Sequence, residues 1–260
     1  MDTSGNVAVA LALTLLAGLS TGIGSTIAYF IRRPKIVYLA FSLGLSAGAM
    51  VYVSLVELLP KASDIVGHAT GVLVFFMGIL FIGIVDLLVP EVENPHHYEG
   101  IEDATASHHD ERRLMRAGVM TAVAIGIHNL PEGLATFASA LSDVRLGILI
   151  AVAIAIHNIP EGIAVSVPIF YATSSRNKAF FYSFLSGISE PIGALLGFLV
   201  LSPFLTPAIL AGTLAFAAGI MIYISLDELL PTAHRYGHGH LVISGVVLGM
   251  LMMAVSLLLL

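Results

Sequence analysis

Eight long apolar segments divide this chain, and they constrain its fold more than any other feature. A helix needs roughly 20 apolar residues to cross the hydrocarbon core of a bilayer, and the strict alternation typical of a membrane barrel is missing. With 57% hydrophobic and 11% charged residues, the composition excludes a water-soluble globule. We therefore predict an all-α polytopic membrane protein, with one domain over residues 1–260. Its eight transmembrane helices are expected at about 6–30, 36–59, 70–90, 117–141, 146–171, 178–202, 207–230 and 241–260.

The loops between these segments differ in their content of basic residues. The loops on one side hold nine Lys and Arg residues, whereas those on the other side hold only Lys61 and Arg145. Because cytoplasmic loops are enriched in basic residues, the side with nine is expected to face the cytoplasm, which places both termini outside. The polar loop 91–116, which is rich in His and acidic residues, is then expected in the cytoplasm. It could bind metal weakly or serve only as a solvated linker. The nine residues are Arg32, Arg33, Lys35, Arg112, Arg113, Arg116, Arg176, Lys178 and Arg235.

Two internal repeats indicate an inverted architecture. Residues 48–62 (GAMVYVSLVELLPKA) match residues 219–233 (GIMIYISLDELLPTA) at an offset of 171 residues, in the second and seventh predicted helices. Residues 122–135 (AVAIGIHNLPEGLA) match residues 151–164 (AVAIAIHNIPEGIA) at an offset of 29, in the adjacent fourth and fifth helices. In both cases the copies cross the membrane in opposite directions. The layout is three helices, a central inverted pair and three helices, which is typical of secondary transporters.

Groups that can bind a metal ion gather in the middle of three predicted helices. In each HN-x-PEG motif the histidine and glutamate are four residues apart and share a helix face, and the proline frees a backbone carbonyl one turn earlier. Nitrogen and oxygen ligands without thiolate suit Zn²⁺, Fe²⁺, Mn²⁺ or Co²⁺, and the chain has no cysteine. The candidate metal ligands are His128, Asn129, Glu132, His157, Asn158, Glu161 and Glu190.

The charge of this set predicts more than one bound cation or proton. Three ionised carboxylates exceed the charge of one divalent ion, so we expect a binuclear or proton-linked site bridged by Glu132 and Glu161. Four further residues are candidates for the pathway, with plain alternatives beside them. Met50 could lend a thioether ligand or simply pack in the core. The carboxylates of Glu57 near the outer end and of Asp227 and Glu228 near the inner end could relay cations or merely lie at the interface.

The paired HN-x-PEG motifs, the Ser189-Glu190-Pro191 step and the ELLP ends of the second and seventh helices resemble the ZIP (Zrt/Irt-like) metal transporter family. The length and the two motif copies are most similar to its bacterial ZupT branch. The resemblance implies an inner-membrane importer of zinc, iron, manganese and cobalt with both termini outside, and it assigns the same seven residues to the metal site. Some bacterial relatives have Gln-Asp where this chain has His157-Asn158. The family also suggests that helices one, four, five and six slide against two, three, seven and eight.

We expect a carrier that moves divalent metal into the cytoplasm by alternating access, with no catalytic cofactor and no ATP-binding P-loop. A selective divalent-cation channel and an efflux pump remain open, because both use similar ligands. An intramembrane metalloprotease would need HExxH, and Asn129 and Asn158 replace its general base, so we do not expect an enzyme. The expected partners are metal ions and the lipid bilayer. Small residues spaced four apart would allow a homodimer to form. The net charge of −6 gives no indication of a basic surface that could bind nucleic acid.

Overall fold

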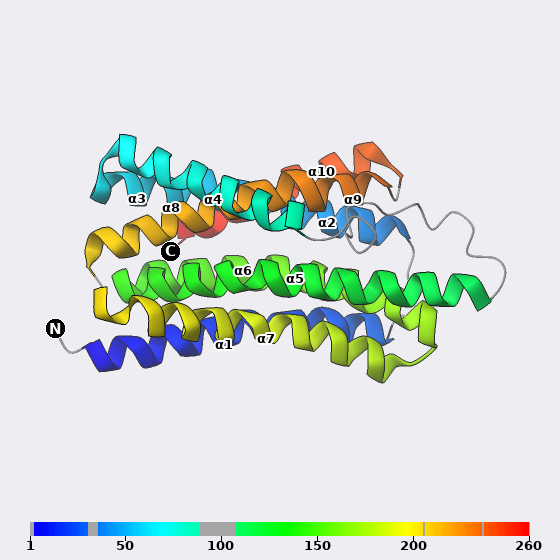
Figure 1. Ribbon diagram of the computed structural model, residues 1–260. Coiled ribbons are helices and arrows are strands. Elements are labelled where there is room, and N and C mark those ends of the chain that lie inside the picture. The colour runs from blue at the N-terminus through cyan, green and yellow to red at the C-terminus, as the bar shows by residue number, and fades with distance from the viewer. Residues whose placement is uncertain (1–2, 31–35, 89–107, 205, 236, 260) are drawn as a thin grey trace.

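The computed structural model describes residues 3–30, 36–88, 108–204, 206–235 and 237–259. Apart from short turns, the chain is helical in these ranges and contains no strand, which confirms the predicted all-α class. The described chain forms eight long rods that run along one another (Figure 1). Both termini lie at the same end of the bundle, as an even number of crossings requires.

The first four rods are α1 (Thr3–Phe30), α2 (Ile36–Val53) with its continuation, α4 (His68–Leu88) and α5 (His108–Ser142). The last four are α6 (Val144–Thr173), α7 (Arg176–Leu201), α8 (Pro207–Ile224) with its continuation, and α10 (Gly239–Leu259). The second rod continues through the π-helical turn η1 (Ser54–Leu58) into α3 (Leu59–Val66). The seventh continues in the same way through η5 (Ser225–Leu229) into α9 (Leu230–Arg235), and a 3₁₀ turn, η4 (Ser202–Phe204), follows α7.

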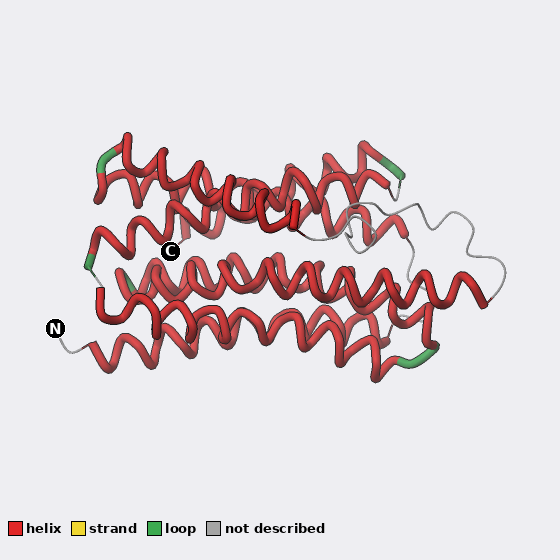
Figure 2. The backbone as a smooth tube through the Cα atoms, in the orientation of Figure 1, coloured by secondary structure: helices red, strands yellow, loops and turns green. Residues whose placement is uncertain are grey.

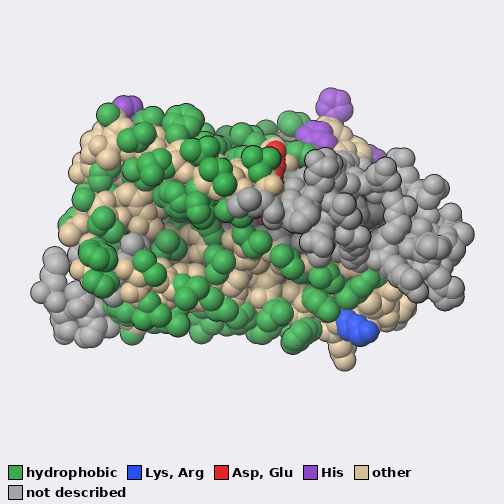
Figure 3. Space-filling view, viewed as in Figure 1, with side chains coloured by type: hydrophobic (Ala, Val, Ile, Leu, Met, Phe, Trp, Pro, Cys, Tyr) green, Lys and Arg blue, Asp and Glu red, His purple; other side chains and the backbone are tan. Residues whose placement is uncertain are grey.

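Length and hydropathy fit a membrane protein. Within the described ranges, seven of the rods are long and apolar enough to cross a bilayer. The other rod, α5, has 35 residues and spans the full height of the bundle (Figure 2). Hydrophobic side chains cover the sides of the bundle in Figure 3. Leu80 and Leu199 are each 62% exposed, for example, and such a surface would favour aggregation in water but suits contact with lipid.

The rods form two layers (Figure 1). Helices α1, α5, α6 and α7 pack against one another in one layer. The other layer holds α2, α4, α8 and α10, in which α2 packs on α10 and α4 packs on α8. The two layers meet mainly where α2 contacts α6 and α5 contacts α8. This division corresponds to the two groups of helices that the family resemblance named.

The internal repeats correspond to repeated structure. In both outer copies the leucine N–H donates to the carbonyl of the serine five residues earlier, from Leu59 to Ser54 and from Leu230 to Ser225. The proline after each leucine has no N–H group and cannot donate the usual helical hydrogen bond. Just before the proline, the backbone hydrogen bonds span five residues and form a π-helical turn. Close helix packing repeats as well. A Cβ on Gly48 would overlap the carbonyl oxygen of Val246, and one on Gly219 would overlap that of Phe75.

Three predicted boundaries differ from the structure. Residues 108–116 of the predicted loop 91–116 belong to α5, because acidic residues in the first turn and arginines after it favour a helix. The remainder of that loop up to residue 107 lies outside the described residues. The second helix continues past 59 to Val66 because Pro60 stands in the first turn of α3, where a missing N–H is tolerated. Gly67, with φ of +85°, then ends it. The seventh helix likewise continues past 230 to Arg235.

Candidate metal site

Three helices of one layer bring six of the predicted ligands into the interior of the bundle. All six side chains have 0% exposed surface. Burying carboxylates in this way costs several kcal/mol each, of the order of 3, unless they are paired, protonated or bound to a cation. The side chain of His128, the seventh predicted ligand, lies outside the described part of the structure. The six residues are Asn129 and Glu132 on α5, His157, Asn158 and Glu161 on α6, and Glu190 on α7.

Direct contacts join the two HN-x-PEG motifs to each other and to α7. The imidazole Nε2 of His157 lies 3.0 Å from Oε1 of Glu132, which links α6 to α5. The amide of Asn158 donates to Oε1 of Glu190 on α7. The side chain of Glu161 is bound from the opposite layer, because the hydroxyl of Ser46 on α2 donates to its Oε1 at 3.3 Å.

The two asparagines make matching contacts with backbone carbonyls. Asn129 donates to the carbonyl oxygen of Ser186 on α7 at 3.1 Å, and Asn158 donates to that of Ala17 on α1 at 3.0 Å. Each amide therefore uses its NH₂ group within the protein and turns its carbonyl oxygen elsewhere. Neither Oδ1 has a hydrogen-bond partner. A buried amide oxygen without a partner costs about 1–3 kcal/mol, and a bound cation would remove that cost.

The glycine of each motif explains how other helices approach the site so closely. A Cβ on Gly133 would overlap the carbonyl oxygen of Glu190, and a Cβ on Gly162 would overlap that of Thr21. Only glycine permits this approach of one backbone to another. The glycines thus hold α7 against α5 and α1 against α6.

The donor set suits a borderline divalent metal, since it combines imidazole nitrogen, carboxylate oxygen and amide oxygen. Among the described side chains, no three His, Asp or Glu residues are grouped closely enough to hold one ion by themselves. The amide oxygens of Asn129 and Asn158, which have no hydrogen-bond partner, are further oxygen atoms that could bind an ion here.

Comparison with known proteins decides the family. The family model described as "ZIP Zinc transporter" matches residues 85–257. The chain belongs to the ZIP family. Among its curated relatives is the zinc transporter ZupT of Nitratidesulfovibrio vulgaris, which is 56% identical over 100% of this chain and 99% of the relative. The ZupT proteins of Chlorobium limicola (56% identical) and Lysinibacillus sphaericus (54%) each match 98% of this chain and 99% of their own lengths. The resemblance inferred from the paired motifs is thereby confirmed.

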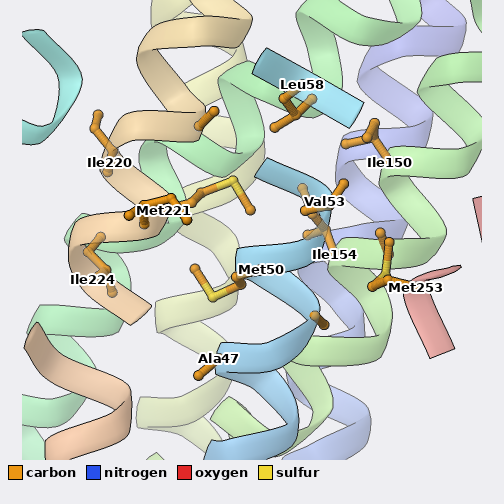
Figure 4. Packing of buried hydrophobic residues seen from close by; sticks show 14 of the residues in the cluster. Ala47, Met50, Val53, Leu58, Ile150, Ile154, Ile220, Met221, Ile224 and Met253 are labelled. Carbon is orange, nitrogen blue, oxygen red and sulfur yellow. The ribbon is translucent and has the colours of Figure 1, made fainter. Parts of the chain in front are cut away.

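An apolar block packs near the site of this ZIP protein, on the side towards the end of the bundle where both termini lie. Met50 and Met221, which occupy matching positions in the outer repeats, are both buried and lie close together (Figure 4). Ile150 and Ile154 of α6, two turns and one turn before Asn158, belong to the same cluster. The sulfur of Met50 lies 4.0 Å from the hydroxyl of Ser46. The same hydroxyl donates to Oε1 of Glu161, so packing and metal binding both stay predictions for Met50.

The other predicted pathway residues lie towards the ends of the rods. Glu57 forms a 2.6 Å ion pair with Lys61, whose side chain is 44% exposed. Asp227 is exposed on η5, and Glu228 next to it is half-buried. The hydroxyl of Tyr223, one turn before Asp227, donates to Asp86 on α4 at 3.3 Å. These carboxylates are exposed or half-buried, in contrast to the six fully buried side chains of the site.

Sequence reasoning missed the contributions of α1 and α2 to the site. Ser46 carries no motif, and its repeat partner is Ala217, so nothing in the sequence singles it out. The contribution of α1 had a signal, because residues 17–24 (AGLSTGIG) match residues 186–193 (SGISEPIG) around Glu190. From that match one would predict that α1 packs against α6 in the same way as α7 packs against α5.

Proposed function

We propose that this ZIP protein transports zinc, and also iron, manganese and cobalt, into the cytoplasm. The observation that carries the proposal is the convergence of six fully buried imidazole, amide and carboxylate side chains from two inverted motifs and α7. The names of the relatives, all zinc transporters, support zinc as the substrate. The wider metal range follows from a donor set without thiolate, which discriminates poorly among borderline divalent ions.

The arriving metal replaces hydrogen bonds that hold the site together. The contact between Glu132 and His157 keeps a proton between two groups that would both bind a metal. A divalent ion entering between α5 and α6 displaces that proton and gains the amide oxygens of Asn129 and Asn158. Three ionised carboxylates still exceed the charge of one such ion. We therefore infer a binuclear or proton-linked site in which Glu132 and Glu161 bridge.

We infer transport by alternating access. The apolar block around Met50, Met221, Ile150 and Ile154 would close the site towards the end that carries the termini. A carrier alternates such closure between its two sides. We infer that the layer of α1, α5, α6 and α7 moves against the other layer, and that the hydrogen bond from Ser46 to Glu161 breaks as it moves. The ion would enter past Glu57 and leave past Asp227 and Glu228, towards loop 91–116.

The location and orientation follow from the basic residues. The turn between α6 and α7 lies at the end of the bundle opposite both termini (Figure 1), and α7 begins there with Arg176. Enrichment of basic residues at that end favours its cytoplasmic location. We propose a protein of the inner membrane with both termini outside, acting as a single domain that has the capacity to form a homodimer through small-residue helix faces.

Two other functions are distinguishable by experiment. A selective channel uses the same ligands, but its flux would rise linearly with metal concentration, whereas a carrier saturates. A metalloprotease lacks support, because Asn129 and Asn158 replace the general base of HExxH. Peptide cleavage in detergent would nevertheless reveal one.

The test is metal uptake into proteoliposomes loaded with a metal-sensitive dye. Wild-type protein should give saturable uptake of Zn²⁺, Fe²⁺, Mn²⁺ and Co²⁺, and Glu132→Ala and Glu161→Ala should abolish it. Asp64→Ala is the matched control, since Asp64 is an exposed carboxylate on α3. Wild-type uptake no faster than in empty liposomes, or full activity in both glutamate variants, would refute the proposal.

A further inference from the structure

The inverted repeat extends to the first and sixth rods, and this extension identifies a residue that has had no role so far. Residues 17–24 and 186–193 match at an offset of 169, with Gly18, Ser20, Ile23 and Gly24 identical in both copies. The packing follows the match. A Cβ on Gly24 of α1 would overlap the carbonyl oxygen of Ile159, and a Cβ on Gly193 of α7 would overlap that of Leu130. Leu130 and Ile159 are themselves partners in the central repeat. Helix α1 therefore packs against α6 through equivalent residues to those by which α7 packs against α5.

The asparagine contacts obey the same relation. Asn129 donates to the carbonyl of Ser186, and Asn158 donates to the carbonyl of Ala17, and Ala17 and Ser186 are partners at the offset of 169. Four residues further along each helix stand Thr21 and Glu190. Glu190 accepts a hydrogen bond from Asn158, and the symmetry of the repeat therefore predicts a place for Thr21 beside Asn129.

The hydroxyl of Thr21 differs from those of its neighbours on α1. Thr14 and Thr26 each donate to the carbonyl four residues earlier, at 2.9 and 2.8 Å. Thr21 is fully buried, yet its Oγ1 has no hydrogen-bond partner, and the carbonyl four residues earlier, that of Ala17, already accepts from Asn158. The Oδ1 of Asn129 also lacks a partner. Two buried oxygens are thus left unsatisfied in the half of the site that has no counterpart of Glu190, at about 1–3 kcal/mol each.

We propose that the hydroxyl of Thr21 is a further ligand of the transported cation, opposite Glu190. This inference rests on the proposed function. A hydroxyl in place of a fourth carboxylate adds an oxygen ligand without adding charge, which lets a doubly charged ion leave again. A neutral oxygen is also a hard donor, and hard donors favour Mn²⁺ relative to Zn²⁺. Thr21 therefore widens the selectivity of the site towards manganese.

The first test compares the uptake of Mn²⁺ and Zn²⁺ by proteoliposomes containing the wild type, Thr21→Val, Thr21→Ser or Thr14→Val. Thr21→Val keeps the shape and removes the oxygen, and it should lower manganese uptake about tenfold but zinc uptake by about twofold or less. Thr21→Ser keeps the hydroxyl and should behave as the wild type. Thr14→Val is the matched control, since Thr14 is equally buried on the same helix and its hydroxyl is already satisfied.

An unchanged ratio of manganese to zinc uptake in Thr21→Val, with both rates intact or both reduced together, would overturn the ligand role. The result is separable from the proposed function, since failure of that function means no uptake of either metal by the wild type. A second variant gives a readout other than transport. The chain has no cysteine, so Thr21→Cys introduces one thiol, and Cd²⁺ should then produce a thiolate-to-metal absorption band that Thr14→Cys does not. Absence of the band in folded Thr21→Cys would also overturn the proposal.

Discussion

The two layers of the bundle differ sharply in what they bury. Among the described side chains, every fully buried carboxylate, amide and imidazole belongs to α5, α6 or α7, and α1 adds buried hydroxyls. In the layer of α2, α4, α8 and α10, the buried polar groups are hydroxyls alone, such as Ser46 and Ser225. One layer therefore contains the candidate metal ligands. The layer packed against it buries apolar side chains and a few hydroxyl groups. Apolar contacts are not directional, so an apolar face can shift past a polar cluster at lower cost than a second polar face could.

The largest expected effect comes from the glycines that hold the polar layer together. Gly133→Ala should prevent stable folding, because the new methyl group overlaps the backbone of Glu190 and neither backbone can yield. Overpacking of this kind costs about 1–3 kcal/mol or more. Thermal unfolding in detergent is the measurement.

Gly212→Ala on α8 is the matched control, since a Cβ there meets nothing within 4 Å. It should stabilise the apolar layer slightly, by about 0.5–1 kcal/mol. Equal unfolding temperatures for the two variants would show that the close approach of α5 and α7 is not required.

A pair of substitutions separates chemistry from packing across the layers. Glu132→Gln removes a buried charge that faces His157, and losing one partner of a buried pair costs about 3–5 kcal/mol. Uptake of zinc should therefore fall by about 100-fold or more. Met50→Leu keeps the volume of the apolar block and should leave zinc uptake within about threefold of the wild type. A loss in Met50→Leu as large as that in Glu132→Gln would instead make the thioether a ligand.

A smaller effect is expected where the layers touch. Ser46→Ala removes the hydrogen bond to Glu161, and a typical hydrogen bond contributes about 0.5–1.5 kcal/mol. Because the bond exists in the conformation described and would break on moving, its loss should change the maximal rate of zinc uptake by about three- to tenfold. Ser244→Ala is the control, since that hydroxyl donates only within α10 and is exposed. Identical kinetics for the two variants would mean that this contact does not couple the layers.

The smallest effect should come from the periphery. Lys61→Met breaks the ion pair with Glu57, which is partly exposed, and such pairs contribute about 0–1 kcal/mol. Zinc uptake should change by about twofold or less. A larger change that disappears at high salt would show that Glu57 attracts the incoming cation, as the pathway proposal holds.

The local chemistry of the site could be predicted from the sequence, because helix geometry determines it. A spacing of four residues brings Glu161 back to the helix face of His157, and the same motif in α5 predicted a second set of ligands. The hydropathy pattern located the helices, although it missed the start of α5 at His108 and the continuation of two rods through π turns. Those boundaries depend on turn and capping interactions of single residues, which average hydropathy does not record.

The sequence by itself predicted the long apolar helices, the inverted copies among them and the types of side chain that could bind a metal. Only the tertiary structure decided which of those groups meet: Glu132 with His157, Asn158 with Glu190, and Glu161 with a serine from the other layer. It also showed that the hydroxyl of Thr21 is buried without a hydrogen-bond partner, on which the proposed ligand role rests. The reason is physical. Spacing along a helix is set by covalent geometry, whereas contacts between helices depend on their rotation and crossing angle, which many small packing contacts determine together.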